Sequence, residues 1–373
     1  MILRFAFGLV LLMLLGCAKS TLKSGTPGVC PDNCVTISAQ YAVAQMGKGV
    51  NLGQMFESDQ HPPTMEKAVP KIDAYYDRGF RNIRIPVTWT EKIADVYMAN
   101  PDTGRVHRDG DRLGVLKEVI DYALSKPGMY VVLNAHHEKR LKDENRAAVL
   151  EQLWHDISDI FKERDHRLIF EILNEPHLTS TDPMLPENLR KMTELAYKNI
   201  RIDDKNRLIA IGGNQWFAAG EMAKTWPNLD QVGGGKDSHL MATFHHYDPW
   251  EFSGDSQGDY ADKWTDENIS EPMDTMIEWS KTIGNNMPIF IGEWGVGWGS
   301  RYGEMRCNNI RLWYSKFDKE YASKKGIATV LWDDGGWFKV FDHNTNSFNN
   351  NLAECIDGEC EIEGKERYNE GCL

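Results

Sequence analysis

Two short stretches decide the fold of this 373-residue chain: IFEILNEPH at residues 169–177 and PIFIGEWG at residues 288–295. Each is an apolar run of strand length that ends in a glutamate followed by Pro or Trp. Strands this apolar are buried on both faces, as in parallel sheets, so each glutamate is expected where its strand leaves the core. Glu175 and Glu293 are therefore predicted to lie together at one end of a parallel sheet.

Strand-like and helix-like segments alternate along the rest of the chain. The predicted strands are residues 47–53, 81–87, 129–136, 168–174, 208–212, 240–246, 288–293 and 327–332. Predicted helices include residues 65–78, 113–126, 146–164, 189–202, 275–284 and 308–325. Alternation of this kind implies parallel pairing, and eight units fit a single-domain α/β fold, the (β/α)8 TIM barrel. A doubly wound open sheet is the rival, but the GVNLG segment at residues 49–53 lacks the expected glycine-rich phosphate turn.

Composition limits the class of partner. The formal charge of −13 argues against nucleic acid or an anionic membrane surface as a ligand, whereas a neutral polysaccharide is compatible with it. The 12 tryptophans are suggestive, because flat indole faces stack on sugar rings, although most tryptophans in any protein belong to the core. Their positions must separate the two cases.

The N-terminus is typical of an export signal. Arg4 precedes an apolar run at residues 5–15 that is too short to span a bilayer, and the run ends in Leu-Leu-Gly-Cys17. That ending resembles the bacterial lipobox, in which the cysteine becomes lipidated; an ordinary secretory signal is the alternative. We expect a signal peptide at residues 1–17, a tether at 18–36 and a catalytic domain at 37–373. If Cys17 is lipidated, the protein is an exported lipoprotein anchored to a bacterial membrane or the cell surface. With an ordinary secretory signal, it is secreted.

The other six cysteines are even in number, which in an exported protein suggests up to three disulfides. They are Cys30, Cys34, Cys307, Cys355, Cys360 and Cys372. Cys30 with Cys34 and Cys355 with Cys360 are close enough to pair locally, but the sequence leaves the connectivity open. No two have the C-x-x-C spacing of zinc sites.

Polar and aromatic residues cluster at the predicted strand ends, where the chemistry of a barrel gathers. They are Arg84 within the second strand, followed by His136-His137-Glu138, Asn174-Glu175, Asn214-Gln215-Trp216, His245-His246-Tyr247, Glu293-Trp294 and Trp332-Asp333-Asp334. A pair of carboxyl groups, one protonated and one ionised, is the chemistry of glycoside hydrolysis. Adjacent strand residues point to opposite faces, so the two His-His pairs are not expected to chelate a metal.

This order and spacing resemble glycoside hydrolase family 5 over residues 48–356, most specifically in Asn174-Glu175-Pro176. The resemblance implies that Glu175 is the general acid/base and Glu293 the nucleophile. It also implies a sugar-binding site, to which loop position adds Trp216. The predicted substrate-binding residues are Arg84, His136, His137, Asn174, Trp216, His245, Tyr247 and Trp332. Two positions depart from the family pattern, Gln54 and Trp294, and both are expected near the sugar cleft.

The resemblance implies a retaining, endo-acting hydrolase of β-1,4-glucans that needs no metal or organic cofactor. We also expect a monomer that does not bind nucleic acid and that contacts a membrane only through the lipid anchor predicted from the N-terminal sequence. β-Mannanase or xyloglucanase activity is the alternative, and a non-catalytic glycan-binding lipoprotein is a further one. Arg84 and Tyr247 are expected to hold Glu293 ionised. Glu175, in a more enclosed setting, is expected to have a raised pKa. Arg84 could equally form a buried structural ion pair with Glu171.

Overall fold

We analysed a computed structural model of the protein, which describes residues 36–254, 264–297, 308–349 and 351–360. The predicted signal peptide with Cys17, nearly all of the tether, and Cys30, Cys34, Cys307 and Cys372 lie outside these residues. Cys355 and Cys360 form a disulfide, which is one of the two local pairings that the sequence left open. Among the described residues, no helix is both long enough and apolar enough to cross a membrane.

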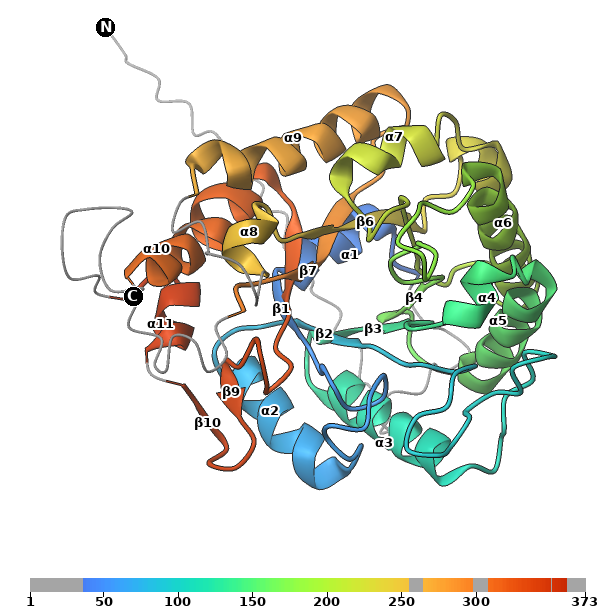
Figure 1. Ribbon diagram of the computed structural model, residues 1–373, viewed down its shortest axis with the longest axis horizontal. Coiled ribbons are helices and arrows are strands. Elements are labelled where there is room, and N and C mark those ends of the chain that lie inside the picture. Colours follow the sequence, from blue (N-terminus) through green and yellow to red (C-terminus); the bar gives the residue numbers. More distant parts are fainter. Residues whose placement is uncertain (1–35, 255–263, 298–307, 350, 361–373) are drawn as a thin grey trace, which may run out of the picture.

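Eight parallel strands close into a barrel, which confirms the predicted fold class (Figure 1). The strands are β1 (Lys48–Asn51), β2 (Asn82–Ile85), β3 (Tyr130–Asn134), β4 (Leu168–Glu171), β5 (Ile209–Gly212), β6 (Leu240–His246), β7 (Ile289–Trp294) and β8 (Ala328–Leu331). Each strand pairs with its neighbours in the sequence, and β1 pairs with β8 to close the ring. All eight lie within one or a few residues of the ranges expected from the sequence.

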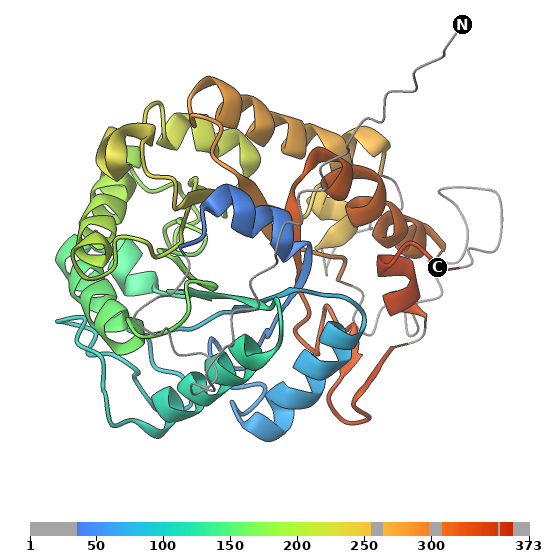
Figure 2. The same ribbon diagram turned by 180° about the vertical axis from the view of Figure 1, so that it is seen from behind.

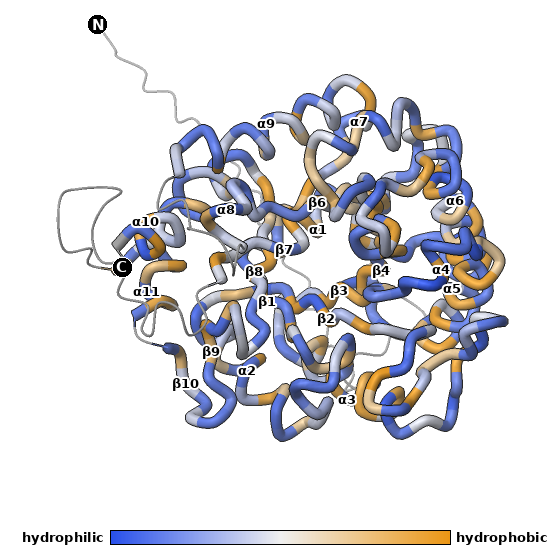
Figure 3. Tube along the Cα trace, in the orientation of Figure 1, coloured by the Kyte–Doolittle hydropathy of each residue, from blue (hydrophilic) through white to orange (hydrophobic). Residues whose placement is uncertain are grey.

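A ring of helices surrounds the barrel. The longer ones are α2 (Met65–Asp77), α3 (Asp111–Ser125), α5 (Ala147–Phe161), α6 (Pro186–Asp203), α9 (Asp266–Thr282) and α10 (Asn308–Lys316). Shorter helices follow several strands: α4 (Lys139–Asp143), α7 (Met222–Thr225), α8 (Trp250–Ser253) and α11 (Leu352–Ile356). Hydrophobic and hydrophilic stretches alternate along the outer helices in Figure 3, as expected where one face packs on the barrel.

Two helices differ from the sequence-based prediction. Helix α9 begins at Asp266, nine residues before the predicted start, because Thr265 caps it: its hydroxyl accepts from the backbone N–H of Asn268. The predicted helix at 308–325 instead changes at Phe317 into a π-helical segment, Phe317–Ala322. A tight 3-10 turn, Ser323–Lys325, then leads into β8.

Several short elements were missing from the prediction, among them α4, α7, α8 and the paired strands β9 (Phe341–Asp342) and β10 (Ser347–Phe348). Another is α1 (Ala39–Met46), a short helix that closes the N-terminal end of the barrel. In Figure 2, which shows the molecule from behind, α1 lies across the barrel opening in dark blue. Its buried side chains join the apolar residues inside the barrel in one cluster, which includes Val132, Ile169 and Phe290. This end of the barrel is therefore filled by hydrocarbon.

The barrel interior changes from apolar to polar along the strands. Ile169 belongs to the apolar cluster, whereas Glu171, two residues later on β4, bonds to the side chains of Arg84 and Asn134. Because residues two apart point to the same face of a strand, this single step carries the interior from hydrocarbon to charge. The polar layer begins below the carboxyl ends of the strands.

Candidate active site

A β-bulge in β7 positions Glu293. Phe244 of β6 pairs with Ile291, but the next residue, His245, pairs with Glu293, so Gly292 is the extra residue. A Cβ on Gly292 would lie 2.8 Å from Oγ1 of Thr243 and 3.1 Å from Nε2 of His245, which explains why glycine occupies the bulge. The bulge therefore brings Glu293 directly opposite His245.

Glu293 is held by two neighbours that the sequence had predicted. Arg84 Nη1 donates to its Oε1 at 2.7 Å, and the hydroxyl of Tyr247 donates to its Oε2 at 3.0 Å. The residue is 5% exposed. Its carboxylate is thus fixed in orientation by a cation on one oxygen and a hydroxyl on the other.

Glu175 reaches the same place from a strained turn four residues beyond the end of β4. Its backbone is left-handed, with φ of 41°, which is uncommon for a residue other than glycine. His245 Nδ1 lies 2.7 Å from Oε1 of Glu175 and 3.5 Å from Oε2 of Glu293. Carboxylate oxygens of the two glutamates and this nitrogen all lie within 4.8 Å of one another. His245 therefore lies between the two carboxyl groups.

Arg84 links the site to the barrel core. It is fully buried and donates to both oxygens of Glu171, at 2.6 and 2.9 Å. It also donates to the side-chain oxygens of Asn174 at 2.5 Å and Asn51 at 2.9 Å. The ion pair with Glu171 and the contact with Glu293 coexist, so Arg84 forms both the buried structural ion pair and the contact with the predicted nucleophile.

Burial raises the pKa of both carboxyl groups, and neighbouring charges act against that rise. Burial raises the pKa of Glu175 to about 7, with Lys142 and His177 acting against that rise. Burial also raises the pKa of Glu293, and the guanidinium of Arg84 acts against that rise. Burial lowers the pKa of His245 to about 4, so near neutral pH it is an uncharged imidazole.

The expectation that Glu175 is the more enclosed carboxyl group is wrong. Its side chain is 21% exposed, against 7% for Glu293. What separates the two is the partner: the carboxylate of Glu293 contacts a guanidinium, whereas that of Glu175 contacts the neutral ring of His245. A nearby cation favours the ionised form of a carboxyl group, and a neutral imidazole does so less.

His136, His137 and Trp332 are also brought together, but not as expected. His136 and Trp332 are both mostly buried and have parallel rings with centroids 6.0 Å apart. The expectation that His136 and His137 point to opposite faces is wrong, because their rings pack edge to face with their centroids 4.4 Å apart. Both residues lie beyond the last residue of β3, where the alternation of a strand no longer applies.

Among the described residues, the three side chains that converge closely enough to hold a metal ion are Glu175, His245 and Glu293. A cation there would have to displace the hydrogen bond between His245 and Glu175. The donor set therefore fits the network of hydrogen bonds without a metal.

The tryptophans fall into two groups, exposed and buried. Trp216 is 38% exposed and stacks on His177, and Trp250 is 56% exposed beside Tyr247. The expectation that Trp294 borders the sugar cleft is wrong, because it is buried and stacks on Phe317. Four further tryptophans are buried in the core: Trp89, Trp154, Trp279 and Trp313.

Sequence reasoning missed two buried charged residues near the site. Glu57, in the loop after β1, accepts from the backbone N–H of Gln54, and burial raises its pKa to about 7. Lys142, on α4, is 4% exposed. Glu57 follows a strand end, so the rule used for the other strands could have found it, whereas no local pattern marks Lys142.

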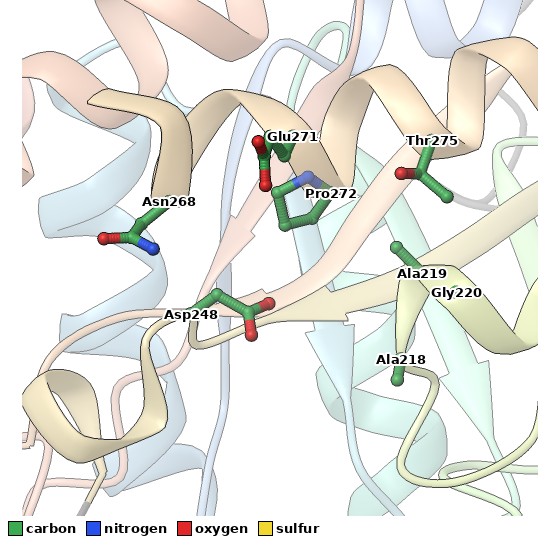
Figure 4. Close-up of a pocket in the computed structure, with 8 residues that line it drawn as sticks. All are labelled: Ala218, Ala219, Gly220, Asp248, Asn268, Glu271, Pro272 and Thr275. Atoms are coloured by element: carbon green, nitrogen blue, oxygen red, sulfur yellow. The ribbon is translucent and has the colours of Figure 1, made fainter. Parts of the chain in front are cut away.

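A pocket of about 290 Å³ lies between α9 and the turn at Ala218–Gly220 (Figure 4). The rest of its lining is Asp248, after β6, and Asn268, Glu271, Pro272 and Thr275 on α9. None of the predicted site residues lines it.

Known proteins share both the sequence pattern and the fold. The family model described as cellulase (glycosyl hydrolase family 5) matches residues 43–336. Endoglucanase H of Acetivibrio thermocellus is 27% identical over 323 residues, which cover 84% of this chain and 33% of that protein. Endoglucanase A of Ruminococcus albus is 27% identical over 342 residues, covering 83% of this chain and 89% of that protein. The chain thus spans about a third of the first relative and most of the second.

Solved structures agree. Cellulose synthase subunit Z of Clostridioides difficile has a TM-score of 0.67 and 25% identity, covering 83% of this chain and 99% of that one. An endoglucanase of the hyperthermophilic Thermotoga maritima has a TM-score of 0.68 and 26% identity, covering 86% of this chain and all of that one. The family match covers most of the sequence and these relatives share its barrel, so the chain belongs to glycosyl hydrolase family 5, the cellulase family.

Proposed function

We propose that this protein is a retaining, endo-acting glycoside hydrolase that cleaves internal β-1,4-glucosidic bonds of cellulose or related β-glucans by double displacement. The observation that carries the proposal is the approach of carboxylate oxygens of Glu175 and Glu293 to within 4.8 Å. Retaining enzymes place their two carboxyl groups about 5–5.5 Å apart, whereas inverting enzymes leave about 6.5–9.5 Å for a water.

In this mechanism Glu293 attacks the anomeric carbon. Its contacts with Arg84 and Tyr247 favour the carboxylate and hold it in one orientation. Glu175, whose pKa burial raises to about 7, keeps its proton near neutral pH and gives it to the leaving oxygen. Once Glu293 is esterified its charge is gone, so Glu175 is free to act as the base that activates water. These steps need no metal or organic cofactor.

His245 is a positioning residue in this scheme rather than an open sugar contact. It is 4% exposed, and its Nδ1 faces both carboxyl groups. His136, Asn174 and Trp332 line the sugar site, with Trp332 beneath the ring of the bound sugar. The exposed face of Trp216 offers a further stacking surface beside Glu175.

The choice of β-1,4-glucan follows the names of the relatives, several of which are endoglucanases. Hydrolysis of a panel of soluble β-glucans, xyloglucan and β-mannan, followed by product sizes, tests it. We expect β-glucan to be cut fastest, into oligosaccharides of mixed length. A preference for mannan or xyloglucan would move the proposal to that substrate, and no hydrolysis of any of them would favour a non-catalytic glycan-binding protein.

Two variants separate the roles of the glutamates. Glu293→Ala should be nearly inert on polymer and on aryl glycosides, because the first step is lost for every substrate. Glu175→Ala should still release a good phenolate quickly and then stall, because no base activates water. Azide should restore its turnover and yield a β-glycosyl azide, whereas azide with Glu293→Ala should yield the α-anomer. The opposite anomers would reverse the two roles.

We also propose that the protein is exported and anchored by a lipid on Cys17, with residues 37–373 as its catalytic domain, and that it is a monomer. The support is the N-terminal sequence, with its short apolar run ending in Leu-Leu-Gly-Cys17. The full-length protein should incorporate labelled fatty acid in a bacterial host and partition with membranes. Cys17→Ser should abolish the label, and unchanged labelling would refute the anchor.

A further inference from the structure

Lys142 is a buried cation directly behind the proposed acid/base. It lies on α4, the single-turn helix that follows β3, and is 4% exposed, whereas its helix neighbours Lys139 and Arg140 are exposed. Burying an ammonium group costs free energy unless polar partners replace the lost water. Its contacts therefore need an explanation.

The ammonium group bonds to the backbone of the site itself. Lys142 Nζ donates to the carbonyl oxygen of Glu175 at 3.2 Å and to that of His136 at 3.4 Å. Nδ1 of His177 lies 2.7 Å from the same carbonyl oxygen of Glu175. Glu175 is the residue with the left-handed backbone, so these contacts hold its strained conformation through the backbone carbonyl group.

Nearby acidic groups are engaged elsewhere. Glu138 accepts from the backbone N–H groups of Trp89 at 2.7 Å and Thr90 at 2.9 Å. Asp143 accepts from the backbone and the hydroxyl of Thr179, at 2.7 and 2.6 Å. Lys142 is thus hydrogen-bonded to carbonyl oxygens instead of a carboxylate, and Glu175, Glu138 and Asp143 act on its charge only through space.

The charges around this pair come from several elements. They are Glu138, Lys139 and Asp143 beside Lys142; His136 and His137 after β3; Glu171 and His177 on β4 and its loop; Arg84 on β2; His245 on β6; and Glu293 on β7. Burial raises the pKa of Glu175, and Lys142 provides the largest opposing effect. Burial lowers the pKa of Lys142 to about 8, and Glu175 provides the largest opposing effect there.

We propose that Lys142 is a positioning residue that ties the strained turn at Glu175 to the end of β3 through the carbonyl groups of Glu175 and His136 and, as a buried cation, sets the pH range over which the Glu175 carboxyl group keeps its proton. The catalytic half of this inference rests on the proposed role of Glu175 as the acid. The electrostatic half does not, because it concerns the proton on Glu175 whatever that proton does.

The test compares Lys142→Met, which removes the charge at similar length, with Lys142→Arg, which keeps a charge at all accessible pH values. Lys139→Met, an exposed neighbour on the same helix, is the matched control. Two quantities are measured for each variant: the pKa of Glu175 from the ¹³C carboxyl shift, assigned by its loss in Glu175→Gln, and the alkaline limb of kcat/KM against pH. Thermal unfolding shows whether each variant folds.

Removing a cation makes the carboxylate harder to form, so Lys142→Met should raise the Glu175 pKa and shift the alkaline limb upward together, by about 0.5–1 pH unit. Its kcat at the optimum should also fall, because the turn at Glu175 loses its hydrogen bond to Lys142 and with it the link to His136. Lys142→Arg, if folded, and Lys139→Met should leave both pKa readouts within about 0.2 of wild type.

Two outcomes overturn the inference: an unchanged Glu175 pKa in folded Lys142→Met, or an equal shift in Lys139→Met. A fall in kcat at every pH with both pKa readouts fixed would reduce Lys142 to a structural contact and equally refute the electrostatic role. If the ¹³C pKa moves while the alkaline limb stays, the inference about Lys142 stands and the assignment of Glu175 as the acid fails. The two proposals can therefore fail separately.

Discussion

Arg84→Met is the perturbation with the largest expected effect on stability. Arg84 is fully buried and neutralises two carboxylates, Glu171 through contacts at 2.6 and 2.9 Å and Glu293 through one at 2.7 Å. Methionine keeps much of the side-chain volume but leaves both carboxylates without their cation. Removing one partner of a buried ion pair costs about 3–5 kcal/mol, so we expect a loss of at least that size in the free energy of unfolding at pH 7.

The loss should depend on pH. Burial raises the pKa of Glu171, but Arg84 outweighs burial and the net pKa lies below its usual value. A carboxyl group with a lowered pKa in the folded state stabilises the protein above its unfolded pKa, near 4.3, and that stabilisation is lost as pH falls through the folded pKa. Without Arg84 the pKa of Glu171 should lie above the usual value. The difference in the free energy of unfolding between wild type and Arg84→Met should therefore be largest at pH 7 and become smaller toward pH 5.

Urea unfolding followed by tryptophan fluorescence at pH 7 and pH 5 measures the effect. Arg108→Met is the control, because Arg108 forms an ion pair of the same 2.7 Å length with Asp159, but the two side chains are 47% and 36% exposed. Its loss should stay below about 1 kcal/mol. Adding Glu171→Gln to Arg84→Met should recover part of the stability, since one orphaned charge is removed. A change below about 1 kcal/mol in Arg84→Met, or no difference between the two pH values, would refute the reasoning.

Three further outcomes are expected. Gly292→Ala should push His245 out of place and lower kcat about 10- to 100-fold while the protein remains folded, and near wild-type kinetics would show that the bulge tolerates a side chain. The kcat/KM profile on soluble β-glucan should fall above about pH 7 as Glu175 loses its proton, because burial raises its pKa to about 7; a plateau to pH 9 would contradict this. Cys355→Ser opens a loop of sequence separation 5 and should cost at most about 2 kcal/mol, seen as a modest drop in Tm, while mass mapping of the wild type should find Cys355 joined to Cys360.

Much of the fold was predictable because it depends on hydrophobic patterns within short segments of the sequence. Apolar runs of strand length alternating with amphipathic segments located all eight strands, since each strand must be buried in a barrel. Helix α1 was missed because eight residues without strong periodicity carry little signal, and it is defined only by the barrel end that it closes. The early start of α9 was missed because its first turns are polar.

The predicted site residues were found for a similar reason: in a parallel barrel the strand ends share one face, so polar residues after different strands must meet. That argument places Glu175, His245 and Glu293 together, and the structure does so within 4.8 Å. The same argument does not predict which residues at the strand ends point into the site and which point into the core. Trp294 follows Glu293 directly and yet is buried in the core against Phe317.

The sequence by itself determined the barrel and the two carboxyl groups, because each depends on patterns or spacings within a few residues, whereas it left the pairing of the cysteines open. Tertiary structure alone decided how enclosed each carboxyl group is, which one has a cation for a partner, and that Lys142 lies behind Glu175. Those properties arise from contacts between distant parts of the chain, such as Arg84 with Glu293, 209 residues apart. Burial and charge act through space, so the proton affinities of the site depend on packing that no local pattern encodes.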